Sequence, residues 1–129
     1  MNYYCGTDII EVERIKKAIL STPGFKEKVF TPSEIEYADK KSDVTRFIHY
    51  AGRFAAKEAV YKSLSKIDND FNLSEIEIIN DSNNKNRPFV NILKPNLSIL
   101  QQEKKLIIDV SISHIKDYAT ANAISTLII

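Results

Sequence analysis

The sequence predicts an α+β fold in which helices pack on an antiparallel β-sheet. Apolar residues recur at helical spacing through most of the first half of the chain, whereas apolar and polar residues alternate through much of the second half. A turn-rich run at residues 81–86 separates two of the strand-like segments, as in a β-hairpin. Since 129 residues fit one domain, we expect residues 1–129 to form a single unit.

The first half of the chain opens on a strand and continues in helices. Aromatic and β-tolerant residues predict the strand, and the Ser-Thr-Pro-Gly run at residues 21–24 ends the helix that follows it. Thr31 has the pattern of an N-cap, with Pro32 in the first turn and Glu34 three residues after the cap. The expected elements are a strand at 2–8 and helices at 9–20, 32–41 and 45–65.

The second half of the chain is mainly strand. Ile76 and Ile78 fall on one face of an alternating segment, which indicates a half-buried strand. Pro95 opens a short helical segment, and residues 114–117 separate the last two strands. The expected elements are strands at 74–79, 88–93, 106–113 and 118–129, and a helix at 95–104.

Composition and motifs exclude several classes of protein. A net charge of +1 does not indicate nucleic acid as a partner, and no apolar stretch is long enough to cross a bilayer. We therefore expect a cytoplasmic protein with no nucleic-acid and no membrane partner. The single Cys5 cannot form an internal disulfide, and its apolar neighbourhood predicts a buried side chain. The chain carries neither Cys/His zinc spacing nor a Gly-rich phosphate loop.

Residues 6–14, Gly-Thr-Asp-Ile-Ile-Glu-Val-Glu-Arg, place an acid where a strand is expected to enter a helix. Asp8 has two interpretations. It is either the cap of a helix that begins at Ile9, or a ligand of a hard divalent cation, which prefers carboxylate oxygens.

Residues 51–62 place an acid on a face of small and apolar residues. On a helical wheel, Glu58 lies in the arc of Ala51, Phe54, Ala55 and Tyr61, with Lys62 one turn on, while Arg53, Lys57 and Val60 point elsewhere. An unpaired carboxylate on a buried face is costly. Two partners would offset that cost: an ion pair with Lys62, or a metal ion shared with Asp8.

The run Val110-Ser-Ile-Ser-His114 ends a predicted strand in polar residues. Ser113 and His114 either bind a phosphate or cap the turn. A nucleophilic serine is not indicated, because the chain has no hydrolase elbow and no histidine besides His49 and His114.

Together these segments resemble the holo-[acyl-carrier-protein] synthases, the small bacterial type of 4′-phosphopantetheinyl transferase. The order and spacing of the motifs cover almost the whole chain. The matching residues are Gly6, Asp8, Ile9, Glu11, Arg14 and Ile15; Gly52 to Ala59 with Lys62; and Ser111 to His114 with the Ala-rich strand that follows.

The resemblance implies transfer of 4′-phosphopantetheine from coenzyme A to a serine of apo acyl carrier protein, for fatty acid biosynthesis. The products are holo carrier protein and adenosine 3′,5′-bisphosphate, the metal is Mg²⁺ with Mn²⁺ as the alternative, and the assembly is a homotrimer. The competing hypothesis is a non-catalytic module that binds carrier proteins and has lost its coenzyme A loop.

The resemblance also implies roles for individual residues. Asp8 and Glu58 hold the metal, Glu58 takes the serine proton, and Lys62 binds a phosphate oxygen. The further implied contacts are Arg53, Ser113 and His114 to the nucleotide phosphates, Arg14 to an acidic carrier helix, and Phe25 as an apolar anchor for the carrier.

The chain departs from the family pattern at two loops. The family's Gly-Thr-Gly loop is here residues 63–68, Ser-Leu-Ser-Lys-Ile-Asp, and its Gly-Lys-Pro turn is Asn86-Arg87-Pro88. Without glycines, close backbone approach to a phosphate is harder. Lys66 has two interpretations: it either supplies charge in place of backbone contacts or is a solvated lysine on a loosened turn.

Overall fold

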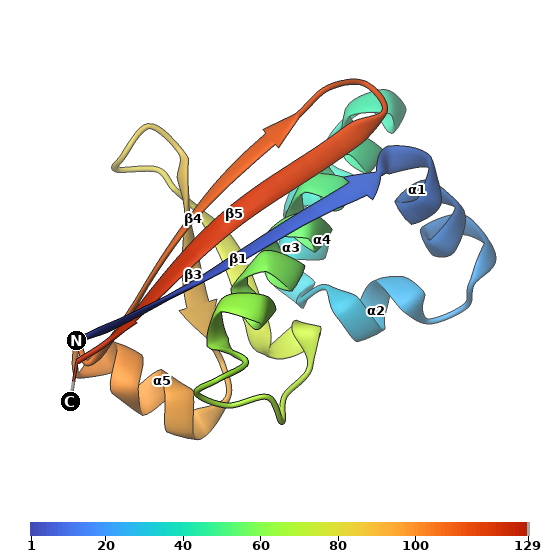
Figure 1. The fold of residues 1–129 in the computed structure, drawn as a ribbon. Coiled ribbons are helices and arrows are strands. Elements are labelled where there is room, and N and C mark those ends of the chain that lie inside the picture. Colours follow the sequence, from blue (N-terminus) through green and yellow to red (C-terminus); the bar gives the residue numbers. More distant parts are fainter. Residues whose placement is uncertain (129) are drawn as a thin grey trace.

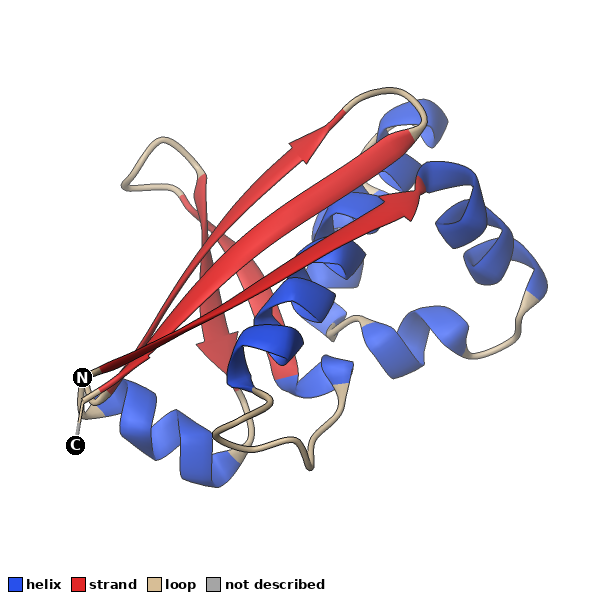
Figure 2. Ribbon diagram, viewed as in Figure 1, coloured by secondary structure: helices blue, strands red, loops and turns tan. Residues whose placement is uncertain are grey.

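The computed structural model describes residues 1–128, which form two antiparallel sheets with helices packed around them (Figures 1 and 2). The prediction of an α+β fold with an antiparallel sheet is confirmed. The larger sheet has the strand order β1 (Asn2–Glu11), β5 (Tyr118–Leu127) and β4 (Leu106–His114), and the smaller pairs β2 (Ile76–Asp81) with β3 (Arg87–Ile92). The start of β1 and the end of β5 lie side by side near α5 (Figure 1).

Helix α4 (Asp43–Leu64) is the central element, in contact with all three strands of the larger sheet. Its N-cap is Ser42, whose hydroxyl accepts a hydrogen bond from the Thr45 N–H. Gly6 of β1 lies so close to the helix that a Cβ there would stand 2.0 Å from the Ala59 carbonyl oxygen. The remaining helices are α1 (Val12–Ser21), α2 (Phe25–Val29), α3 (Pro32–Asp39), α5 (Pro95–Gln102) and the 3₁₀ helix η1 (Leu73–Glu75).

The predicted N-cap at Thr31 is confirmed as a capping box. The Thr31 hydroxyl accepts from the Glu34 N–H at 3.4 Å, and the Thr31 N–H donates to Glu34 Oε1 at 2.8 Å. Within residues 1–128, no helix is long and apolar enough to cross a membrane.

The start of the first helix was predicted wrongly. Strand β1 continues through Asp8 to Glu11, because β5 pairs with it along its whole length, and α1 begins only at Val12. Asp8 is therefore opposite Ala121 within a strand, and the interpretation that it caps a helix is wrong. The five-residue helix α2 was not predicted, and residue 129, the last of the expected final strand, lies outside the described residues.

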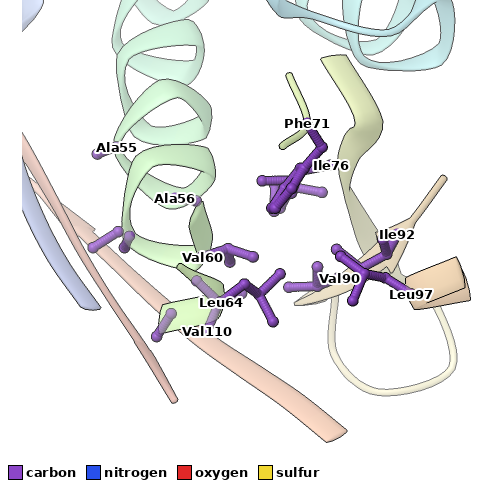
Figure 3. Packing of buried hydrophobic residues seen from close by; sticks show 14 of the residues in the cluster. Ala55, Ala56, Val60, Leu64, Phe71, Ile76, Val90, Ile92, Leu97 and Val110 are labelled. Carbon is purple, nitrogen blue, oxygen red and sulfur yellow. The ribbon is translucent and has the colours of Figure 1, made fainter. Parts of the chain in front are cut away.

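The buried apolar residues form two clusters on either side of α4. In one, Val60 and Leu64 of α4 face Val90, Ile92 and Leu97 (Figure 3). In the other, the opposite side of the helix packs against α1, α2 and α3. The buried members of this second cluster are Val12, Ile15, Val29, Phe30, Ala38, Phe47, Tyr50, Ala51 and Ala119.

Two further expectations about burial are wrong. The helical wheel separated Arg53, Lys57 and Val60 from the packed face, yet all three are buried, because α4 is covered on two sides. Cys5 is exposed on the outer face of β1, not buried.

Candidate active site

A cavity of about 400 Å³ lies between β1, α1 and α4 and brings three predicted site residues together. Asp8 comes from β1, while Glu58 and Lys62 come from successive turns of α4. The Lys62 ammonium donates to the Thr7 carbonyl oxygen at 2.9 Å and lies 3.4 Å from Asp8 Oδ1. The expected alternative, an ion pair between Lys62 and Glu58, is therefore replaced by a pair with Asp8.

The two carboxylates of this cavity affect each other. Partial burial raises the pKa of Glu58, the negative charge of Asp8 raises it further, and Lys62 opposes the shift. Like charges held close together in a partly dry site are unfavourable unless a cation lies near both.

A divalent metal ion fits this donor set if water and substrate phosphates supply its other ligands. Among residues 1–128 no group of three or more His, Cys, Asp or Glu side chains is arranged to hold a metal. Two carboxylates match the way proteins bind Mg²⁺, through one or two carboxylates with the remaining ligands from water and substrate phosphates. The site therefore fits a hard cation that is shared with a phosphorylated substrate, and not a closed protein cage.

The remaining wall of the cavity combines an apolar surface with a basic rim. Phe25 of α2 stacks on Phe54 of α4 with 6.4 Å between ring centroids, and both line the cavity. Arg14, exposed on α1, lies at the same cavity. The two residues expected to meet a carrier protein are thus next to Asp8 and Glu58.

A second cavity of about 490 Å³ contains Arg53 and His114, two of the expected nucleotide contacts. Arg53 is buried and donates to Asn80 Oδ1. Three further basic residues line this cavity and were not predicted from the sequence: Lys41, His49 and Arg87. Their basic side chains were the only signal that the sequence offered. Burial, reinforced by the nearby charges of Arg53, Lys41 and His114, lowers the pKa of His49 to about 3.

The structure separates other expected contacts. The two cavities have no lining residue in common, so within one chain Arg53 and His114 do not meet Asp8 and Glu58. Ser113 lines a third hollow, which shares His114 with the second cavity and Ile9 with the carboxylate cavity. Lys66 is exposed in the loop that follows α4.

The chain matches known proteins along most of its length. A family model described as the 4′-phosphopantetheinyl transferase superfamily matches residues 4–123. A holo-[acyl-carrier-protein] synthase of Fusobacterium nucleatum is 44% identical over 120 residues, covering 92% of this chain and 94% of the relative. One of Ruminiclostridium cellulolyticum is 43% identical over 129 residues, covering 98% of this chain and 94% of the relative.

Solved structures show the same fold. An ACPS–CoA complex of Chronobacterium ammoniagenes aligns with a TM-score of 0.81 at 27% identity, covering 98% of both chains. A holo-(acyl-carrier-protein) synthase of Bacillus anthracis in complex with CoA (3′,5′-ADP) aligns with a TM-score of 0.75 at 29% identity, covering 95% of this chain and 94% of that one.

Proposed function

The chain belongs to the 4′-phosphopantetheinyl transferase superfamily, and we propose that it transfers 4′-phosphopantetheine from coenzyme A to a serine of apo acyl carrier protein in the cytoplasm. The products are holo carrier protein, for fatty acid biosynthesis, and adenosine 3′,5′-bisphosphate. The observation that carries the proposal is the convergence of Asp8, Glu58 and Lys62 on one cavity in a chain that is 44% identical to a holo-[acyl-carrier-protein] synthase.

The chain's own residues supply most of the chemistry. The serine oxygen attacks the β-phosphorus of coenzyme A, and the bond from that phosphorus to the oxygen of the leaving nucleotide breaks. Glu58 takes the serine proton, directly or through a water. Lys62 contributes a point charge to a phosphate oxygen. Mg²⁺, or Mn²⁺, held by Asp8 and Glu58 would stabilise negative charge on the pyrophosphate.

The basic cavity around Arg53 and His114 is the proposed site for the nucleotide phosphates. Because this cavity and the carboxylate cavity do not meet within one chain, we propose that each active site forms between two copies of a homotrimer. The outer face of the larger sheet supports this assembly, since it exposes large apolar side chains in all three strands. They include Tyr3, Ile9, Ile107, Tyr118 and Ile124.

The decisive experiment incubates the purified protein with apo acyl carrier protein, coenzyme A and Mg²⁺, and follows the intact mass of the carrier. Transfer adds one phosphopantetheine group. If the carrier binds without gaining that mass, the chain is the non-catalytic binding module.

The shared site is tested by mixing subunits. Glu58→Gln chains and His114→Ala chains are each expected to be inactive, and co-folded mixtures are expected to regain part of the activity. A fully active monomer by light scattering would contradict the trimer.

A further inference from the structure

Lys57, the residue before Glu58, has a side chain that is 0% exposed. Its ammonium lies 2.6 Å from Glu34 Oε1, and the Glu34 side chain is only 2% exposed. Burial lowers the pKa of Lys57, and the Glu34 charge opposes that shift. Three backbone carbonyls also accept hydrogen bonds from the ammonium: Val29 at 2.9 Å, Leu73 at 3.1 Å and Ile76 at 2.5 Å.

Stability alone does not account for this buried charge. Removing a lysine and a glutamate from water costs several kcal/mol per ion, and well-packed apolar residues of similar volume often stabilise a fold equally well or better (about 1–4 kcal/mol). What apolar residues would not supply is a set of directed bonds. The ammonium joins α4 to the end of α2, to the first turn of α3, to η1 and to the start of β2.

The Glu34 carboxylate extends the same network. Its Oε1 accepts from the Thr31 N–H and its Oε2 accepts from the Ile78 N–H, both at 2.8 Å. The segments that surround α4 on this side are therefore all bonded, directly or through Glu34, to one residue of the helix, Lys57.

That residue is next to the proposed catalytic carboxylate. Within residues 1–128 the Glu58 side chain has no hydrogen bond or ion pair of its own. Its direction therefore depends on how α4 is rotated and placed. Phe25, on the short helix α2 that Lys57 holds at Val29, stacks on Phe54, one turn before Glu58 in the cavity.

We propose that Lys57 is a positioning residue for the transfer reaction, which locks the rotation of α4 and the place of α2 so that Glu58 faces Asp8 across the cavity. Lys57 acts only through Glu58 and the cavity wall, so its role rests on the function proposed above. It touches neither the substrate nor the metal.

Two variants test this role. The double variant Lys57→Met with Glu34→Gln removes both buried charges together. Lys57→Met alone would leave the Glu34 carboxylate buried without its partner, which would endanger folding. Lys57→Arg keeps the charge, but its planar fork does not reproduce the contacts of an ammonium. We expect folded proteins whose kcat is lower by about 10- to 100-fold, the size of effect that small misplacements of a catalytic group produce.

A stability control is needed, because a purely structural lysine would also lower the melting temperature. Leu97→Ala removes a buried side chain of α5, outside both cavities, and is expected to lower stability while leaving kcat per folded molecule unchanged. If the Lys57 variants keep wild-type kcat at a stability matched to Leu97→Ala, the positioning role is refuted.

A second readout separates this inference from the proposed function. Mn²⁺ binding, followed by the paramagnetic signal of the free ion, needs no turnover. We expect about 10-fold weaker binding in both Lys57 variants and unchanged binding in Leu97→Ala. Wild-type Mn²⁺ affinity in a folded Lys57 variant would overturn the inference. An inactive wild-type protein that still binds Mn²⁺ would instead overturn the proposed function, and the Mn²⁺ comparison would still decide the role of Lys57.

Discussion

Lys62 pairs with Asp8 across the contact between α4 and β1, with 3.4 Å between Nζ and Oδ1, and not with Glu58 on the same helix. The pair joins residues from opposite ends of the first half of the chain. It leaves Glu58 beside a carboxylate whose charge is partly balanced, and both acids line the same cavity. With its side chain 52% exposed, Lys62 retains the freedom to turn toward a phosphate.

The first prediction concerns the two carboxylates. Asp8→Asn and Glu58→Gln keep the side-chain volumes but remove the charges that would hold Mg²⁺. Each is expected to lower transfer by about 100-fold or more, because electrostatic groups at the reacting centre contribute effects of that size. The intact-mass assay measures the rate, and circular dichroism checks the fold. Near wild-type turnover in either variant would show that the metal assignment is wrong.

Arg14 should set the affinity for the carrier. Its side chain is exposed on α1 and lies at the carboxylate cavity. Arg14→Glu is expected to raise the KM for the carrier at least about 10-fold and to leave the KM for coenzyme A nearly unchanged. Added salt should weaken carrier binding to the wild type, since exposed charges are screened. A carrier KM that is indifferent to both changes would exclude this surface.

The loop after α4 provides a test of Lys66. In this loop the Asp68 carboxylate accepts hydrogen bonds from the Lys94 ammonium at 2.7 Å and from the Asn96 side-chain amide at 2.9 Å, while Lys66 is exposed. If Lys66 binds a phosphate, Lys66→Ala should weaken coenzyme A binding by about 10- to 100-fold, as expected for a charge-assisted hydrogen bond.

Calorimetry with coenzyme A and with dephospho-coenzyme A locates the contact. A loss of affinity only for the full coenzyme would place Lys66 at the 3′-phosphate. Equal affinities of the wild type and Lys66→Ala for both ligands would show that Lys66 is a bystander.

Gly6 should be intolerant of any side chain. A Cβ there would lie 2.0 Å from the Ala59 carbonyl oxygen and 2.8 Å from the Ser63 nitrogen, both backbone atoms. Gly6→Ala would force β1 away from α4 and is expected to cost about 3 kcal/mol of unfolding free energy. Gly52→Ala is the matched control, because its Cβ would meet only the Ile112 side chain, at 3.2 Å. Equal losses in the two variants would contradict the tight contact.

Acid should destabilise the protein partly through His49. Its pKa is about 3 in the folded protein and ordinarily 6.5, so between these values the unfolded chain binds the proton more readily. Stability is therefore lost as pH falls below about 6.5, by up to about 1 kcal/mol near pH 5 for this partly buried group. Urea unfolding near pH 7.5 and pH 5 should show a smaller loss in His49→Asn. An identical pH dependence would exclude His49 as the cause.

Local patterns were sufficient for several features of this protein. Helical spacing predicted α4, strand alternation and turn residues predicted the β2–β3 hairpin, and the Thr31 cap was visible because its partners are three residues apart. Asp8, Glu58 and Lys62 were named as site residues from their motifs, and the structure places them at one cavity.

Only the tertiary structure decided the rest. Strand β1 runs on through Ile9 because β5, from the other end of the chain, pairs with it, and no local pattern contains that partner. The helical wheel placed Lys57 away from the small, apolar face of the helix, yet Lys57 is buried against Glu34, since α4 is covered by a sheet on one side and by helices on the other. Burial and charge pairing depend on contacts between distant segments, and those contacts exist only once the chain has folded.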